Sequence, residues 1–166
     1  MTAPPPGPAP GPGPAPGPAP APDPGPSPGP ARVPLPPTGR DLLAGKVVVV
    51  TAAAGTGIGS AAVRRCLAEG AQVVISDQHE RRLAAVRDEL AGAHEGRVWA
   101  CPCDVTDEGQ VGELIAGSVR QFGRIDVLIN NAGLGGTSSV PDMTDEQWHR
   151  VLDVTLTGTF RCTRAA

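Results

Sequence analysis

The stretch that decides the fold is KVVVVTAAAGTGIG, from Lys46 to Gly59. Its run of β-branched residues ends at Thr51 and changes at once to alanine and glycine. Such a run is typical of a strand buried on both faces, and the glycines predict a tight turn. Because Gly55, Gly57 and Gly59 have no Cβ, the backbone of this turn can approach a phosphate group closely, and the next helix can pack against the strand.

The residues around this turn match the dinucleotide-binding fingerprint. A helical pattern follows the turn, a second strand is predicted over Gln72–Ser76, and an acid, Asp77, ends that strand. A helix that begins near Gly57 points its free N–H groups and the positive end of its dipole at a pyrophosphate. The alternative is an ordinary strand-to-helix turn without a ligand.

Composition divides the chain into two parts. The 166 residues include 20 Pro and 22 Gly, and most of the prolines lie between Pro4 and Pro37. Residues 1–40 are predicted to be a disordered tail with extended polyproline character, because they cannot bury enough apolar area to offset their ordering entropy. Alternatives are a ligand for a proline-binding partner domain, or an extension without a function. Residues 41–166 are enough for one domain.

Charge and cysteine usage exclude several classes of protein. The net charge is −3, so no basic footprint predicts binding to nucleic acid or to an anionic membrane. The sequence contains neither an apolar run of about 18 to 20 residues nor the pattern of a secretory signal. Cys101 and Cys103 are too close together for a usual zinc pair, so no metal site is predicted. We expect a cytoplasmic protein with reduced thiols.

Strands and helices are predicted to alternate along residues 41–166. After the first strand, helices are expected over 57–69, 80–90 and 107–122, with a last helix from Asp145, and strands over 72–76, 97–101 and 125–130. Short strands separated by helices predict right-handed crossovers and a parallel, doubly wound sheet, with a ligand at the carboxyl ends of the strands.

Helical periodicity predicts which faces are buried. Helix 107–122 has an apolar stripe at Val111, Leu114, Ile115, Ser118, Val119 and Phe122. The last helix begins with a capping box, with Thr144 as N-cap and Gln147 reaching back. Its inward stripe is predicted at Trp148, Val151, Leu152, Thr155, Leu156, Thr159, Phe160 and Thr163. This helix has no stop signal, so we expect that the chain is cut in mid-element.

With these motifs in order, residues 43–166 resemble the short-chain dehydrogenase/reductase family. The resemblance is carried by the glycine turn from Thr51 to Gly59, by Asp77, by Asp104-Val-Thr-Asp107, and by the Asn-Asn-Ala-Gly sequence that begins at Asn130. It implies an α/β protein with a three-layer Rossmann fold, here truncated after the fourth strand and the helix that follows it.

The resemblance also implies roles for individual residues. Thr51 belongs to the turn, and Gly55, Gly57, Ile58 and Gly59 are expected to face the pyrophosphate. Asp77 is expected to bind the hydroxyl groups of the adenosine ribose. The adenine ring is expected beside Asp104 and Val105, and the nicotinamide ribose beside Asn131, Ala132 and Gly133.

The carboxylate of Asp77 predicts NAD as the cofactor in preference to NADP. It would attract a free ribose 2′-hydroxyl and repel a 2′-phosphate, by roughly 4 kcal/mol before screening for charges about 4 Å apart. Arg81 and Arg82 are an alternative partner for a phosphate, but we interpret them as the solvated face of their helix.

Three departures from the family pattern are visible. Ala52 and Ala53 stand where the first glycine of the turn is usual, which affects the geometry of that turn. Thr155 replaces the Asn that supports catalysis in the family. The family's Ser and Tyr-x-x-x-Lys are not found, and the chain contains no Tyr. The 166 residues are therefore expected to be inactive alone.

The leading hypothesis is an oxidoreductase that transfers hydride between NAD and a carbonyl or secondary alcohol, a small-molecule substrate. Within the family, the chain looks most like actinobacterial reductases of acyl-CoA-linked or steroid-derived carbonyls. The full-length form is expected to be a homo-oligomer, a dimer or a tetramer. A non-catalytic dinucleotide-binding module and an inactive truncated product are the alternatives. The strand at Val127–Ile129 is expected to form an apolar edge that favours aggregation.

Overall fold

The structure is a computed structural model that describes Gly7, residues 36–135 and residues 138–166. Pro37–Ala166 form one compact unit. The predicted tail over residues 1–40 lies almost wholly outside the described residues, so its disorder and the domain boundary at residue 40 stay predictions.

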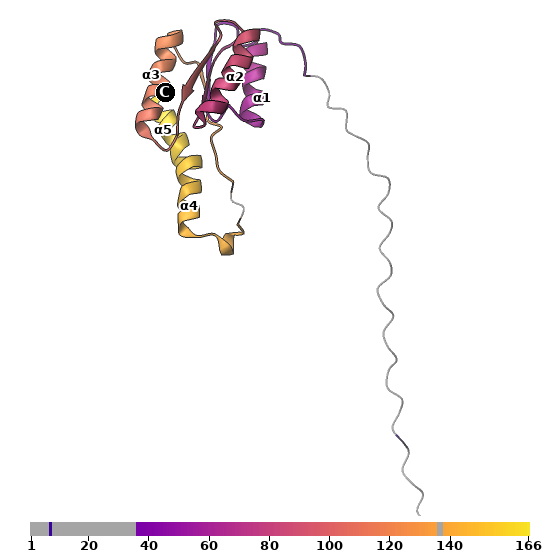
Figure 1. Ribbon diagram of the computed structural model, residues 1–166, viewed down its shortest axis with the longest axis vertical. Helices are drawn as coiled ribbons and strands as arrows, with labels where there is room; N and C mark the ends of the chain where they lie inside the picture. Colours follow the sequence, from indigo (N-terminus) through magenta and orange to yellow (C-terminus); the bar gives the residue numbers. More distant parts are fainter. Residues whose placement is uncertain (1–6, 8–35, 136–137) are drawn as a thin grey trace, which may run out of the picture. The chain divides into compact units, whose positions relative to one another are not determined.

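The compact unit is built on a parallel four-stranded sheet (Figure 1). Its strands are β1 (Val47–Val50), β2 (Gln72–Asp77), β3 (Val98–Pro102) and β4 (Val127–Ile129), in the order β3-β2-β1-β4. β1 lies between β2 and β4, so that Val50 pairs with Ile75 on one side and Ile129 on the other. This central position explains why all four valines of β1 are buried.

Helices connect the strands and follow the last of them. They are α1 (Ile58–Ala68), α2 (Glu80–Ala93), α3 (Glu108–Phe122), the short 3-10 helix η1 (Val140–Asp142), α4 (Asp145–Leu152), the π-helical segment η2 (Asp153–Thr157) and α5 (Gly158–Ala165). The predicted alternation is confirmed, with ends displaced by a few residues. The capping box of α4 is also confirmed, since the Thr144 hydroxyl accepts from Gln147 N and the Gln147 side chain accepts from Thr144 N.

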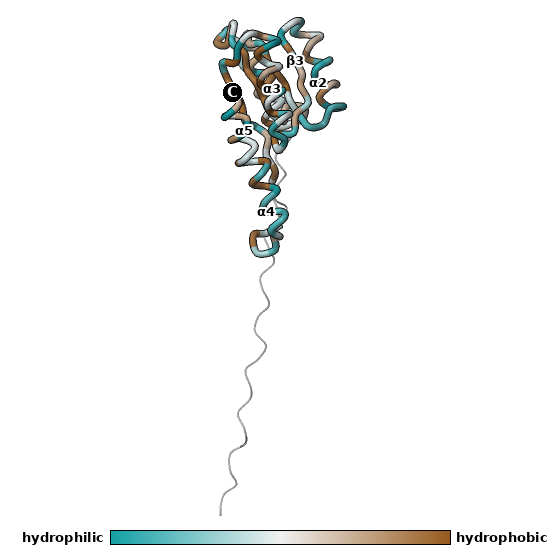
Figure 2. The backbone as a smooth tube through the Cα atoms, turned by 90° about the vertical axis from the view of Figure 1, so that its left-hand side faces the viewer, coloured by the Kyte–Doolittle hydropathy of each residue, from teal (hydrophilic) through white to brown (hydrophobic). Residues whose placement is uncertain are grey.

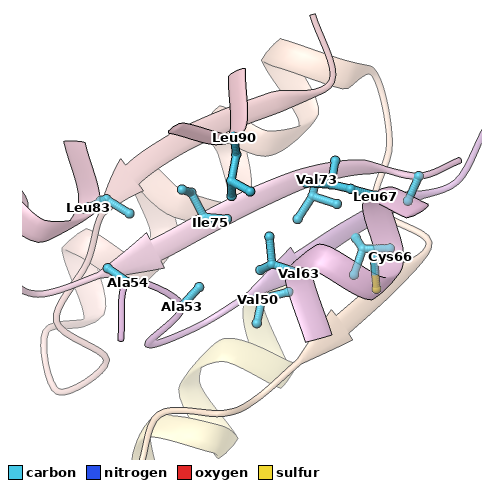
Figure 3. Packing of buried hydrophobic residues seen from close by; sticks show 12 residues of the cluster. Val50, Ala53, Ala54, Val63, Cys66, Leu67, Val73, Ile75, Leu83 and Leu90 are labelled. Atoms are coloured by element: carbon cyan, nitrogen blue, oxygen red, sulfur yellow. The ribbon is translucent and has the colours of Figure 1, made fainter. Parts of the chain in front are cut away.

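Alternate residues of each strand face opposite layers of helices. Val50 and Ile75 pack with α1 and α2 on one face, as Figure 3 shows. Val49 and Val74 pack with α3 and α5 on the other face. The predicted three-layer doubly wound fold is therefore confirmed. In Figure 2 the hydrophobic segments gather in the body of the domain, whereas α4 alternates between hydrophilic and hydrophobic residues.

The predicted stripe of α3 is correct except at one position. Val111, Leu114, Ile115 and Ser118 are buried and Phe122 packs on the same cluster, whereas Val119 is 44% exposed. The helix turns Gly117 toward the sheet instead, where a Cβ would lie 2.5 Å from the Trp99 ring. This close approach rotates Val119 away from the core.

The predicted inward stripe of the last helix is wrong. Trp148, Leu156 and Phe160 are half or more exposed, and the buried residues are Gly158 and Cys162. Trp148 precedes the π-helical segment η2 and is exposed on α4, whereas for Leu156 and Phe160, which lie within and after η2, this segment is the physical reason. It inserts more residues per turn than an α-helix, so a stripe counted at α-helical spacing before η2 points to a different face after it.

Candidate functional site

A cleft of about 480 Å³ lies at the carboxyl ends of the strands, where the sheet topology predicts a ligand. The loops after β1, β2, β3 and β4 contribute to its wall, together with α2, α4 and η2. Its lining residues are Ala52, Gly55, Asp77, Gln78, Arg82, Cys103, Asp104, Val105, Thr106, Ala132, Gly133, Leu134, Arg150, Asp153 and Val154.

The glycine turn leaves the start of α1 open. An added Cβ at Gly57 would meet no atom within 4 Å, and at Gly55 it would meet one only at 3.9 Å. Gly57 is the N-cap of α1, and within residues 36–135 no side chain caps this end and no acidic residue lies in its first turn. The Ile58 side chain is 82% exposed. The first N–H groups of α1 are therefore available to an anionic ligand.

The side chains of Thr51 and Asn131 make a set of hydrogen bonds, called the clamp here, that joins the turn to the loop after β4. The Thr51 hydroxyl accepts from Asn131 N at 2.9 Å and from Ala132 N at 3.0 Å. The Asn131 side-chain amide donates to the carbonyl oxygens of Thr51 and Ala52, both at 3.0 Å. These bonds join the loop after β1 to the loop after β4. Neither Thr51 nor Asn131 lines the cleft, so their direct partners in the structure are backbone groups.

Gly59 is required for packing at the same point. A Cβ there would lie 2.5 Å from Asn131 Nδ2 and 2.8 Å from the Ala52 carbonyl oxygen. Helix α1 can reach the clamp only because this side chain is absent. The structure thus gives Gly59 a packing function, and its expected approach to a pyrophosphate stays a prediction.

The alanine variant of the turn has a distinct geometry. Ala52 has a φ of +50°, in the left-handed region that disfavours residues with a Cβ. Ala53 is fully buried, and its N–H donates to the Ser76 carbonyl oxygen at 2.8 Å. The strain at Ala52 is held in place by the Asn131 amide, which binds the Ala52 carbonyl oxygen.

Asp77 is buried at the end of β2 and faces the cleft. Its Oδ2 accepts from Ala54 N at 3.2 Å, and its Oδ1 accepts from His79 N at 2.9 Å. The Arg82 guanidinium lies 3.6 Å from Oδ1 and also lines the cleft. Arg82 is exposed, in agreement with its interpretation as part of the solvated face of its helix. Because α2 begins close to Asp77, the first turn of the helix also brings this guanidinium near the carboxylate.

The loop after β3 forms the wall next to Asp77, and its Cys103 N–H donates to the Asp77 carbonyl oxygen at 3.2 Å. Asp104 Oδ1 accepts from the Thr106 N–H and hydroxyl, which fixes the turn. Val105 is buried, and an added Cβ at Gly158 of α5 would lie 2.7 Å from Val105 Cγ2. Burial, and then the neighbouring Cys162 and Cys101, raise the pKa of the Cys103 thiol to about 12. Cys103 is therefore a neutral wall residue of the cleft and no nucleophile.

Thr155 lies in η2 beside the loop after β4. Its hydroxyl accepts from Leu134 N at 3.1 Å, and an added Cβ at Gly133 would lie 3.6 Å from the same oxygen. The alternative of a buried Thr that donates to its own helix is wrong, because Thr155 is exposed and fixes a loop. Thr155 lies next to Gly133, and its expected site-facing role in catalysis stays a prediction.

The structure brings half of the predicted site residues to the wall of one cleft. Its wall includes Gly55, Asp77, Asp104, Val105, Ala132 and Gly133, whereas Thr51, Gly57, Ile58, Gly59, Asn131 and Thr155 lie outside the lining. Sequence reasoning missed Cys103, Arg150 and Asp153 as lining residues. The position of Cys103 directly after β3 is a usable signal, but Arg150 and Asp153 belong to the last helical stretch, for which the predicted inward stripe is wrong.

A parallel doubly wound sheet with an uncapped glycine turn and a buried acid at the end of β2 defines a nucleotide-binding Rossmann protein. The sequence pattern of the family described as short chain dehydrogenase matches residues 46–166, and the chain belongs to this family.

Relatives extend this finding. The chain is 63% identical over 128 residues to the (5R,7aS)-5-hydroxy-7a-methyl-1-oxo-2,3,5,6,7,7a-hexahydro-1H-indene-carboxyl-CoA reductase of Mycobacterium tuberculosis, which covers 77% of this chain and 49% of the relative. It is 40% identical over 126 residues to the NADP-dependent mannitol dehydrogenase of Alternaria alternata, covering 74% and 47%. The chain thus spans about half the length of these curated relatives.

A solved structure confirms the fold. The crystal structure of a short chain dehydrogenase from Mycobacterium smegmatis has a TM-score of 0.74 at 63% sequence identity, covering 76% of this chain and 53% of the other. Short-chain dehydrogenases bind a nicotinamide cofactor, and the site fits one: the N–H groups of α1 are open to a pyrophosphate, and the Asp77 carboxylate faces the same cleft. Among the described residues, no helix is long and apolar enough to cross a membrane.

Proposed function

We propose that this chain forms the cofactor-binding half of an NAD-dependent oxidoreductase that acts on a carbonyl or a secondary alcohol. The observation that carries the proposal is the Asp77 carboxylate, which is buried at the end of β2 and faces a cleft that the uncapped start of α1 adjoins. The Asp77 carboxylate suits the hydroxyls of a ribose, and the free N–H groups at the start of α1 suit a pyrophosphate.

Cofactor preference depends on the balance of charge at Asp77. Its carboxylate disfavours a 2′-phosphate, while the Arg82 guanidinium at 3.6 Å offsets part of that repulsion. Arg82 is more than half exposed, so solvent screens its contribution. We therefore propose that NADH binds more tightly than NADPH, with a Kd ratio on the order of ten.

The test is a titration of NADH and NADPH into the purified chain, followed by cofactor fluorescence. We expect Asp77→Asn to weaken NADH binding and to narrow the ratio of the two Kd values. Asp88→Asn is the control for the loss of one carboxylate, because Asp88 is an exposed acid of α2, paired with Arg87 and outside the cleft lining. Tighter binding of NADPH than NADH by the unaltered chain would overturn the NAD assignment.

Substrate and catalysis are proposed from the relatives and from the residues near the cleft. The 63% identity to the Mycobacterium tuberculosis reductase supports a CoA thioester of a hydroindane-type acid as the substrate class. When bound, the nicotinamide supplies or accepts the hydride. Thr155 holds the Leu134 backbone beside the cleft. Because the 166 residues contain no Tyr to exchange the substrate proton, we propose that they are inactive without further residues.

We also propose that the full-length protein is a cytoplasmic homo-oligomer. Trp148, Leu156 and Phe160 expose apolar surface along the last helical stretch, which supports a homo-oligomer for the full-length form. All four cysteines are buried and free in the structure, which supports a reducing, cytoplasmic location. Light scattering of the full-length protein measures the first of these, and a monomer at micromolar concentration would overturn it.

A further inference from the structure

One arginine of α5 connects two walls of the cleft. Arg161 Nη1 donates to Asp153 Oδ1 at 2.9 Å and, more weakly, to the Val105 carbonyl oxygen at 3.5 Å. Asp153 is the first residue of η2, and Val105 lies in the loop after β3. Both residues line the cleft, whereas Arg161 is outside it.

Val105 is buried and packs closely against α5, because an added Cβ at Gly158 would lie 2.7 Å from Val105 Cγ2. Arg161 adds a polar contact at the same place, from α5 to the Val105 carbonyl oxygen. Val105 lies 56 residues before Arg161, so this contact joins separate segments, whereas Asp153 lies 8 residues before it in the same helical stretch. The Arg161–Asp153 pair also spans η2, the segment that contains Thr155.

Burial distinguishes this ion pair from its neighbours. The Arg161 side chain is only 20% exposed and its partner 44%, whereas in the nearby pair of Arg164 with Glu108 the exposures are 50% and 73%. A partly buried pair is less screened by salt than an exposed one. The ion pair of Arg161 is therefore less exposed than that of Arg164, and its partner Asp153 lines the cleft whereas Glu108 does not.

We propose that Arg161 is a positioning residue for the adenosine end of the cofactor site. Its guanidinium sets the spacing between η2, through Asp153, and the loop after β3, through the Val105 carbonyl. This inference rests on the proposed binding of a dinucleotide in the cleft. It assigns a function to a residue that would contact no part of the ligand.

Positioning and charge compensation predict opposite results at Asp153. If Arg161 only neutralised a carboxylate that faces an anionic ligand, then Asp153→Asn would remove the repulsion and improve binding. If the pair sets the width of the site, then Asp153→Asn and Arg161→Gln weaken binding alike, because either one breaks the contact. We expect both variants to raise the Kd of ADP-ribose about fivefold, and the double variant to add little more.

The experiment is calorimetric titration of ADP-ribose, and of the uncharged ligand adenosine, into the full chain and its variants. In Arg161→Gln and Asp153→Asn, we expect the same rise in Kd for both ligands, because both contain adenosine and the variants widen the part of the cleft that binds it. Arg164→Gln is the matched control on the same helix, and it should leave both Kd values within twofold. Arg161→Lys retains the charge without the planar fork and should be intermediate.

The possible outcomes separate the two proposals. Failure of the unaltered chain to bind either ligand would overturn the proposed function itself. Binding by the unaltered chain, together with an unchanged or lower Kd in Asp153→Asn, would overturn the positioning role. If Arg161→Gln unfolds, as circular dichroism would show, Asp153→Asn and Arg161→Lys decide the question.

Discussion

Gly59 offers the sharpest test of how the turn is built. In the Gly59→Ala variant, the new Cβ would lie 2.5 Å from Asn131 Nδ2 and 2.8 Å from the Ala52 carbonyl oxygen, and neither distance is tolerable. The Asn131 amide must move, and it then loses its bonds to the carbonyl oxygens of Thr51 and Ala52. Ala52, at a φ of +50°, loses the contact that holds it there.

The expected magnitude follows from these contacts. Two backbone-accepting hydrogen bonds contribute about 1 kcal/mol each, and overpacking in a well-packed region costs about 1 to 3 kcal/mol. Because some relaxation is shared, we expect Gly59→Ala to lower the free energy of unfolding by about 2 to 4 kcal/mol. That is a large part of the roughly 5 to 15 kcal/mol of a typical domain.

The assay is urea unfolding monitored by circular dichroism at 222 nm. Gly57→Ala is the matched control, since its Cβ would meet no atom within 4 Å and its φ is −96°. We expect the control to change the free energy of unfolding by less than about 1 kcal/mol. Equal losses for Gly59→Ala and Gly57→Ala would refute the reasoning, because the clamp would then not depend on the missing side chain.

Three further predictions follow from the same structure. Ala52→Gly should raise the free energy of unfolding by about 0.5 to 1 kcal/mol, measured by urea unfolding, because glycine adopts the φ of +50° without strain; a loss would mean that the turn relaxes in solution. The pKa of Asp126 lies below its ordinary value of 3.8, chiefly because its carboxylate accepts from Val47 N, so its stabilisation is complete above pH 3.8 and disappears as the pH falls through the lowered pKa. The thermal midpoint should therefore fall less on acidification from pH 5 to pH 3 in Asp126→Asn than in the unaltered chain, and an identical fall would contradict this. Val127→Lys on β4, an edge of the described sheet, should reduce self-association in light scattering, because a charged residue blocks pairing between edges; unchanged association would place the contact elsewhere.

The sequence determined the order and type of the elements and the general location of the site. The run at Val47–Val50 favours a buried strand, because it is short, wholly β-branched and followed by a glycine turn, and the structure confirms it. Asp77 was identifiable because strand ends and glycine turns follow local rules, and parallel strands bring their carboxyl ends together.

Only the tertiary structure decided which faces and partners are used. The π-helical segment η2 lies between α4 and α5, and it redirects Leu156 and Phe160 outward while Asp153 lines the cleft. Periodicity assumes one helical repeat, so it could not contain that shift. The bonds of Asn131 to Thr51 and Ala52 and the reach of Arg161 to Val105 join segments 56 to 80 residues apart. Such contacts depend on how the folded layers meet, and no local pattern in the sequence specifies that.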